Sequence, residues 1–160
     1  DRNEIAKAAD YIVFMGYDQN GVSSPKEGTT AGCDWVEANI NKFLGQEGVP
    51  ANKLILAVPF YTRAWLEEDG ELDSKVWNMK DIYDNIPDGA NIEWDDSLKQ
   101  NYAEYEEDGA TYKVWIEDDD SIKAKLELVK KYNLAGAAYW EKDREPENLW
   151  NTISEVLGVE

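Results

Sequence analysis

Three short runs of apolar residues constrain the fold of this chain more than any other feature of its sequence. The runs are Tyr11–Met15, Leu54–Tyr61 and Leu134–Trp140. Continuous apolar runs of this length are typical of strands that are buried on both faces. Apolar residues at helical spacing follow the runs, in segments near 36–44, 122–133 and 149–157. Strands that alternate with helices in this way predict parallel βαβ units, and therefore an α/β fold.

The middle of the chain has a different pattern, because it is amphipathic and rich in tyrosine. Ile92 and Trp94 alternate with polar residues, as expected for a strand with one buried face. The run Glu107-Asp108-Gly109-Ala110 predicts a tight turn between two antiparallel strands, at residues 102–106 and 111–117. The middle segment is therefore expected to form an antiparallel α+β insertion.

Two further local expectations accompany this insertion. We expect a short helix at Met79–Ile86 and a solvated loop at Glu67–Asp69. The chain then divides into an α/β part, residues 1–65 and 115–160, and the insertion, residues 66–114.

The composition excludes several classes of site. The chain has 160 residues, too few for a closed (β/α)8 barrel, which needs about 200 to 250. It contains no histidine, which excludes Ser-His-Asp and Cys-His catalysis and every metal site with imidazole ligands. Cys33 is the only cysteine, so an intrachain disulfide cannot form. Seven tryptophans and nine tyrosines suit either a core with hydrogen-bonded rings or a groove that stacks sugars.

The net charge limits which kinds of molecule this chain can bind. Acidic residues number 34 against 16 basic ones, which gives a net charge of −18 at pH 7. Such a chain repels phosphate groups, so we expect neither nucleic acid nor an anionic membrane as a partner. The run Leu54–Tyr61 is too short to span a bilayer. The first residues, Asp1-Arg2-Asn3-Glu4, resemble the interior of a helix rather than a signal peptide. We therefore expect this chain to be part of a longer protein.

Polar and aromatic side chains stand where each apolar run ends. They are Tyr17 and Asp18, Tyr61 and Arg63, and Trp140 and Glu141. Because the carboxyl ends of parallel strands meet at one edge of a sheet, we expect these side chains to converge. Hydroxyl, carboxylate and guanidinium groups beside an indole ring suit a sugar. A structural role, such as an ion pair between Asp18 and Arg63, explains any one position more simply, whereas the coincidence at three ends favours a site.

The segments around these ends resemble glycoside hydrolase family 18, the chitinase-like (β/α)8 barrels. Met15-Gly16-Tyr17-Asp18 is similar to the M-x-Y-D that ends the family's sixth strand. Ala57–Arg63 resembles the G-x-P-x-Y-x-R of the seventh strand, with alanine at the first position, and Gly136–Trp140 resembles the eighth. Tyr112–Asp118 is similar to the return from an insertion after strand seven. The resemblance implies a partial TIM barrel, strands six to eight, with a chitinase-type α+β insertion.

The resemblance also implies a mechanism. The N-acetyl oxygen of the substrate attacks the anomeric carbon in a retaining hydrolysis, without a metal or organic cofactor. Tyr17 is expected to orient the N-acetyl group with support from Asp18, and a cis peptide bond is expected after Trp140. The residues expected to bind the substrate are Met15, Tyr61, Arg63, Trp140 and Glu141.

One part of the family pattern is absent from these residues. The D-x-x-D-x-D-x-E motif, whose glutamate is the general acid, has no counterpart in the 160 residues. We therefore expect this chain alone to be inactive, and the longer protein to hydrolyse an N-acetylhexosamine polymer, either chitin or peptidoglycan. A non-catalytic, lectin-like sugar-binding or interaction module is the alternative.

The narrower resemblance is to bacterial cell-wall and spore-associated members, which implies an extracellular or cell-wall location. The strand edges that a full barrel would pair predict either a homodimer of this chain or a rearranged terminal segment that covers the opening.

Overall fold

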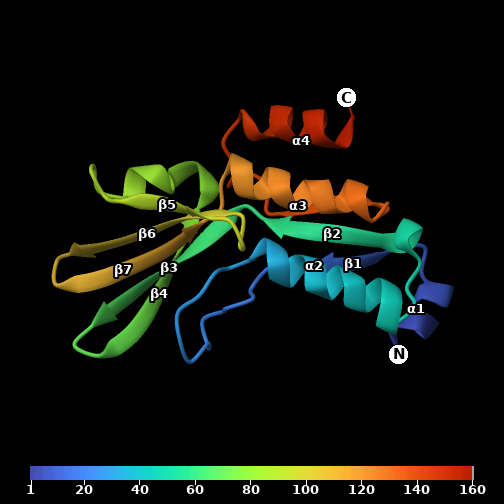
Figure 1. Ribbon diagram of the computed structural model, residues 1–160, viewed down its shortest axis with the longest axis horizontal. Helices are drawn as coiled ribbons and strands as arrows, with labels where there is room; N and C mark the ends of the chain where they lie inside the picture. The colour runs from blue at the N-terminus through green and yellow to red at the C-terminus, as the bar shows by residue number, and fades with distance from the viewer. Residues whose placement is uncertain (160) are drawn as a thin grey trace.

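The computed structural model describes residues 1–159 and contains two sheets of different kinds (Figure 1). The parallel sheet has the order β1-β2-β8, with β1 (Ile12–Met15), β2 (Leu54–Pro59) and β8 (Gly136–Trp140). The antiparallel sheet has the order β4-β3-β7-β6-β5, with β3 (Tyr61–Glu68), β4 (Glu71–Asn78), β5 (Ile92–Asp95), β6 (Gln100–Glu107) and β7 (Ala110–Ile116). The prediction of three parallel strands with an antiparallel insertion is confirmed.

Three of the four α-helices in residues 1–159 pack over one face of the parallel sheet, and the first, at residues 2–8, lies at the amino ends of its strands. The helices are α1 (Arg2–Ala8), α2 (Cys33–Asn41), α3 (Asp119–Lys131) and α4 (Leu149–Leu157), with a π turn at Lys42–Gln46 and 3-10 turns at Ala51–Lys53, Met79–Asp81 and Tyr83–Asn85. Helix α3 contacts β2 and β8, and α2 and α4 lie on either side of it (Figure 1). Leu54, Leu56 and Val58, at alternate positions of β2, are fully buried in this core together with Ile40 and Leu126.

The other face of the parallel sheet is open, which corrects the expectation that its strands are buried on both faces. Phe14 is buried, whereas Val13 and Met15 keep 52% and 63% of their surface exposed. Paired residues of a parallel sheet point to the same side, so Met15 shares this open face with Ala57 and Ala138. The helices of the described residues cover only the opposite face, and this is why a continuous apolar run is half exposed.

The second apolar run is not one strand, which corrects the prediction for residues 54–61. Strand β2 ends at Pro59, which has no N–H to donate to a ladder. The N–H of Phe60 donates to the Trp140 carbonyl at 2.7 Å, and β3 begins at the next residue, Tyr61. Tyr61 and Arg63 therefore lie in the antiparallel sheet, immediately beyond the carboxyl end of β2.

The prediction of a solvated loop at Glu67–Asp69 is wrong, because this segment is the end of a hairpin. Strand β3 continues to Glu68, and Asp69-Gly70 closes the β3–β4 hairpin with φ values of 51° and 80°. The predicted turn at Asp108-Gly109 has nearly the same geometry, with φ values of 52° and 89°. Both are Asp-Gly turns with positive φ at two positions, which suit the twist of a two-residue hairpin.

The helix expected at Met79–Ile86 is replaced by two 3-10 turns. Ile86 is already extended, with φ −97° and ψ 127°, because it precedes Pro87 and the proline ring disfavours a helical conformation there. The division of the chain at residues 65 and 115 stays a prediction.

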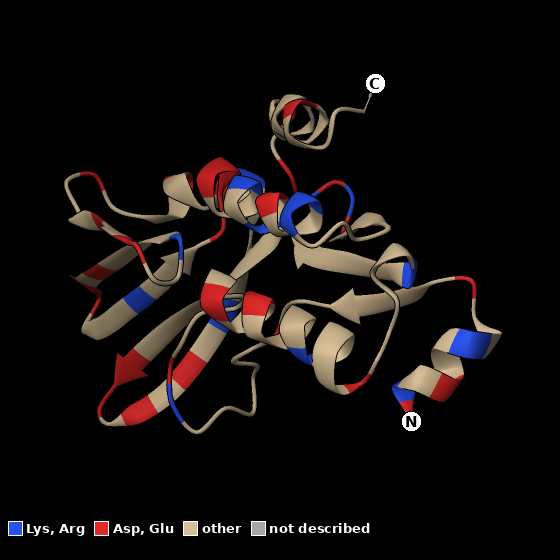
Figure 2. Cartoon of the chain, turned by 45° about the vertical axis from the view of Figure 1, so that its right-hand side comes forward, with Lys and Arg blue, Asp and Glu red and all other residues tan. Residues whose placement is uncertain are grey.

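The acidic side chains are spread over both layers, on the helices and on the hairpins of the antiparallel sheet (Figure 2). Within residues 1–159, no helix combines the length and the apolar character needed to cross a membrane.

Candidate functional site

Asp18 and Tyr61 meet where β1 and β2 end. The Tyr61 hydroxyl donates a 2.6 Å hydrogen bond to Oδ1 of Asp18, and the Tyr17 ring packs edge-on against Tyr61 with centroids 6.2 Å apart. Burial raises the pKa of Tyr61 above its ordinary value, and the bond to Asp18 adds to the shift. Burial, followed by the charge of Asp18, also raises the pKa of Tyr17. Both hydroxyls therefore remain protonated donors at neutral pH.

Arg63 lies two residues beyond Tyr61 on the same face of β3. Its Nη1 donates to Ser74 at 3.0 Å, rather than pairing with Asp18, and its backbone N–H donates to Thr30 at 3.0 Å. The Nε atom of Arg63 is buried and has no hydrogen-bond partner among the described residues. A buried donor without an acceptor costs about 1–3 kcal/mol, so this N–H is a strained feature of the site, while the Arg63 side chain itself lines the cavity described below.

Trp140 ends β8 and keeps 52% of its surface exposed. The Trp140–Glu141 peptide bond is cis, as the sequence resemblance implies. Glu141 forms an ion pair with Arg144, whose Nη2 and Nε lie 2.8 Å and 3.0 Å from the carboxylate Oε1.

A cavity of about 290 Å³ lies between these side chains. Its lining residues are Asp18, Tyr61, Arg63, Val76, Trp140 and Arg144. The structure therefore brings together predicted site residues from all three strand ends. Of the other predicted residues, Tyr17 contacts Tyr61, and Glu141 reaches the cavity through Arg144. Met15 is not among the lining residues, because its side chain lies on the open face of β1.

Two lining residues, Val76 and Arg144, are not among those expected from the sequence. Val76 pairs directly with Arg63 across β3 and β4, so only the register of that hairpin could have identified it. Arg144 follows Trp140 by four residues in a charged loop, where no pattern distinguishes it from its neighbours.

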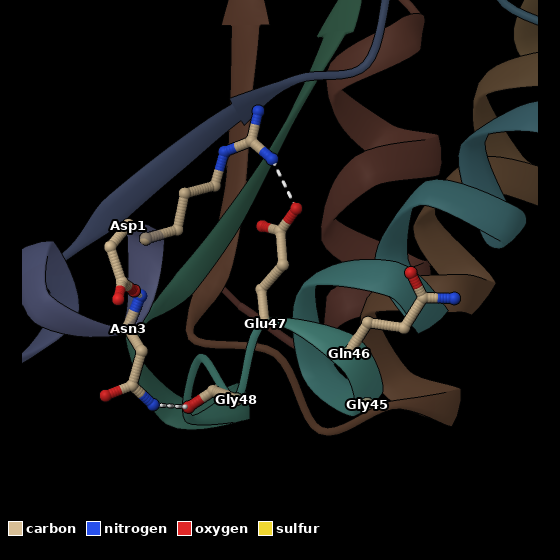
Figure 3. Close-up of a pocket in the computed structure, with 7 residues that line it drawn as sticks. Asp1, Asn3, Gly45, Gln46, Glu47 and Gly48 are labelled. Carbon is tan, nitrogen blue, oxygen red and sulfur yellow. Dashed lines mark hydrogen bonds and ion pairs between the residues drawn. The ribbon is translucent and has the colours of Figure 1, made fainter.

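A larger cavity, of about 740 Å³, lies at the opposite edge of the parallel sheet (Figure 3). It is formed by residues 1–3, which precede β1, and residues 45–48, which precede β2. Arg2 pairs with Glu47, and the Asn3 side chain donates to the Gly48 carbonyl at 3.1 Å. Ligands of parallel α/β units bind at the carboxyl ends of the strands, so the smaller cavity is the candidate site.

The candidate site holds donors, acceptors and one exposed ring, and no metal cluster. In the described part of the chain, no three or more His, Cys, Asp or Glu residues are placed to hold a metal ion. What the cavity can do chemically is bind a neutral, oxygen-rich ring: the indole face stacks on carbon–hydrogen groups, while the hydroxyls and guanidinium donate to oxygens.

A protein-family model described as glycosyl hydrolases family 18 matches residues 1–145. The chain belongs to this family. The family and the partial barrel fold that the sequence motifs indicate are thus confirmed.

Known relatives are longer than this chain. The uncharacterized glycosylase YvbX of Bacillus subtilis is 26% identical over 96% of this chain and 44% of its own length. The cortical fragment-lytic enzyme of the same bacterium is 25% identical over 94% of this chain and 35% of its own length. A chitinase structure from Chromobacterium violaceum matches the whole chain with a TM-score of 0.88 and 28% identity, and the match covers 49% of that protein. This chain therefore spans about half the length, or less, of the relatives that it matches.

Proposed function

We propose that this chain forms the carboxyl-terminal part of the active site of a retaining glycoside hydrolase that acts on an N-acetylhexosamine polymer. The observation that carries the proposal is the cavity lined by the Asp18–Tyr61 pair, the Arg63 side chain and the exposed ring of Trp140. These groups match the stacking face, the hydroxyl groups and the amide of one N-acetylated sugar.

In the proposed reaction, the N-acetyl oxygen of the substrate attacks the anomeric carbon while a carboxylic acid outside this chain protonates the leaving oxygen. Tyr17 donates a hydrogen bond to the N-acetyl group and holds its oxygen toward the anomeric carbon. The raised pKa of Tyr17 keeps this donor protonated. Asp18 acts as a positioning residue, because its bond to Tyr61 fixes the wall beside Tyr17.

The remaining side chains hold the sugar. Trp140 stacks beneath the ring, and the Arg63 guanidinium donates to a hydroxyl or carbonyl oxygen. Glu141 holds Arg144 at the edge of the cavity. Such contacts accelerate the reaction only as far as they are stronger in the transition state than with the bound substrate.

The polymer that we propose is chitin or peptidoglycan, and the location is extracellular or in the cell wall of a bacterium. A related protein of known structure is named a chitinase, and another relative is named a cortical fragment-lytic enzyme. These names support the substrate class without distinguishing the two polymers.

A lectin-like, non-catalytic module is the second candidate. It is favoured by one observation, that the D-x-x-D-x-D-x-E motif has no counterpart in the 160 residues. General-acid catalysis contributes about 10²–10⁴-fold to such reactions, so we expect the isolated chain to release no reducing ends. The two candidates differ in whether the longer protein carries a glutamate or a neutral residue at the end of that motif.

The test is the release of reducing ends from chitin oligosaccharides and from peptidoglycan by the longer protein that contains this chain. Tyr17→Phe is expected to lower kcat by about 10²-fold, since it removes one donor aimed at the reacting group. Tyr105→Phe is the matched control, because its hydroxyl lies outside the cavity and bonds only the Asn85 carbonyl at 3.3 Å. A wild-type protein that binds these saccharides without cleaving them supports the lectin-like candidate instead.

A further inference from the structure

A second groove lies on the antiparallel sheet, outside the site described above. It has a volume of about 400 Å³, and its lining residues are Glu93, Trp94, Asp95, Tyr102 and Trp115. Tyr102 and Trp115 are directly paired across β6 and β7, with ring centroids 4.9 Å apart. Trp94, on the edge strand β5, keeps 43% of its surface exposed, but it pairs with Asn101 and therefore lies at the rim, on the opposite face of the sheet. The groove thus combines one aromatic pair with two carboxylates, Glu93 and Asp95, on the same face.

The loop between β1 and α2 separates this groove from the cavity beside Arg63. Thr30 of that loop accepts a hydrogen bond from the Arg63 backbone, and Glu27 forms a 2.7 Å ion pair with Lys113 on β7. Lys113 lies two residues before Trp115 and on the same face of the sheet. The groove is thus a separate surface rather than an extension of the cavity.

The carboxylates of the groove have unused acceptor capacity. Oε1 of Glu93 accepts from Asn91 at 2.7 Å, and Oδ1 of Asp95 accepts from Ser97 and Leu98. In the described residues, the second oxygen of each carboxylate makes no hydrogen bond. A cross-strand pair such as Tyr102 and Trp115 stabilises a sheet by itself. It does not account for two carboxylates with free acceptor oxygens on the same face as the pair.

We propose that this groove binds a neutral saccharide chain. The carbon–hydrogen face of a pyranose stacks on the rings of Tyr102 and Trp115, and its hydroxyls donate to the free oxygens of Glu93 and Asp95. The two carboxylates and the net charge of −18 repel an anionic ligand. A cation is bound best between aromatic walls on several sides, whereas Tyr102 and the neighbouring Trp115 lie side by side on one face.

The inference rests on the proposed function, which makes a polysaccharide the substrate of the cavity. A second contact with the same polymer raises its effective concentration at the cavity, and thereby strengthens binding without new contacts there. The groove would then strengthen the binding of long chains more than the binding of short oligosaccharides.

The experiment is a titration of the ¹⁵N-labelled chain with the tetramer of N-acetylglucosamine, followed through the indole N–H signals of Trp94, Trp115 and Trp140. We expect the groove signals and the Trp140 signal to titrate independently. Trp115→Ala weakens saccharide binding in the groove, followed at the Trp94 signal on its rim, by about tenfold and leaves the Trp140 titration unchanged. Trp140→Ala has the opposite effect. Tyr102→Ala, on the same face as Trp115, is a second groove variant in case Trp115→Ala does not fold.

Tyr11→Ala is the control, because Tyr11 is 61% exposed and lies in neither cavity. Both titrations should be unchanged in it. If only the Trp140 signal moves, the proposed function stands and the second site is wrong. If the groove signals move with tetramethylammonium and not with the saccharide, the groove is a cation site and the inference is overturned. If no signal moves, the proposed function fails together with the inference.

Discussion

The Tyr61 hydroxyl donates a 2.6 Å hydrogen bond to Asp18, 43 positions earlier in the chain. Asp18 follows β1 of the parallel sheet, whereas Tyr61 is the first residue of β3 in the antiparallel sheet. This bond therefore joins the two sheets at the wall of the cavity. The shape of the cavity therefore depends on the position of the antiparallel sheet relative to the carboxyl ends of the parallel strands.

Tyr61→Phe removes this bond and keeps the ring. The free energy of unfolding is expected to fall by about 1 kcal/mol at pH 7. The pKa of Tyr61 is raised in the folded state above the unfolded value of about 10, so its contribution is present below pH 10 and is lost at higher pH. The difference between wild type and variant should therefore shrink above about pH 10. Urea unfolding near pH 7 and near pH 10.5 measures both effects.

Tyr105→Phe is again the control, because it removes a bond of only 3.3 Å and should change the unfolding free energy by less than about 0.5 kcal/mol. A difference between wild type and Tyr61→Phe that grows with pH contradicts the assigned role of the bond.

The second prediction concerns a fully buried ion pair between Lys125 and Glu117, with Nζ and Oε2 2.9 Å apart. Burial raises the pKa of Glu117, and Lys125 opposes that shift. Lys125→Met leaves the carboxylate uncompensated, so we expect a loss of about 3–5 kcal/mol in unfolding free energy. Adding Glu117→Gln removes the buried charge and should recover part of this loss.

Lys123→Met, on the exposed side of the same helix, is the matched control and should stay within about 0.5 kcal/mol of wild type. Equal effects of the two lysine substitutions in urea unfolding would show that the buried pair contributes no more than a surface lysine.

The same pair illustrates what the sequence could and could not predict. The apolar runs predicted the strands and placed Asp18 and Trp140 at one edge, because strand ends follow directly from where a run stops. Burial of Lys125 could not be predicted, since a charged residue in an amphipathic helix is normally at the surface. It depends on Glu117, which follows β7 and precedes the α3 N-cap Asp118, being buried together with Lys125 between the sheet and the helix. Val76 was missed for the same reason, because its place beside Arg63 depends on a hairpin register.

The third prediction compares two glycines that both have open space where a Cβ would lie. Gly109 has φ +89°, so Gly109→Ala strains the backbone of the β6–β7 turn and should destabilise the protein by about 1 kcal/mol. Gly45 lies in the π turn after α2 without a positive φ, so Gly45→Ala should stabilise by about 0.4–1 kcal/mol. Thermal unfolding of the two variants tests this, and shifts of the same sign would contradict it.

The fourth prediction follows from the open face of the parallel sheet. Strands β1 and β8 each pair with only one strand of the parallel sheet, which is β2. Val13 and Met15, on β1, are exposed. Unpaired edges and exposed apolar side chains favour association, so we expect light scattering to give twice the monomer mass. Replacing Val13 and Met15 together by lysine should give a monomer. Val22→Lys, in a loop and 77% exposed, should leave the dimer intact. A wild-type monomer at all concentrations contradicts the prediction.

The central claim is that the cavity at the carboxyl ends of β1, β2 and β8 recognises an N-acetylated sugar. Saturation-transfer difference NMR on the chain tests it most directly, with the N-acetylglucosamine tetramer against the glucose tetramer. A Trp115→Ala background removes the contribution of the second groove. We expect strong saturation of the N-acetyl methyl groups, loss of this saturation in Trp140→Ala with the fold intact, and little saturation of the glucose tetramer. Equal saturation of both tetramers, or an N-acetyl signal that persists in Trp140→Ala, would contradict it.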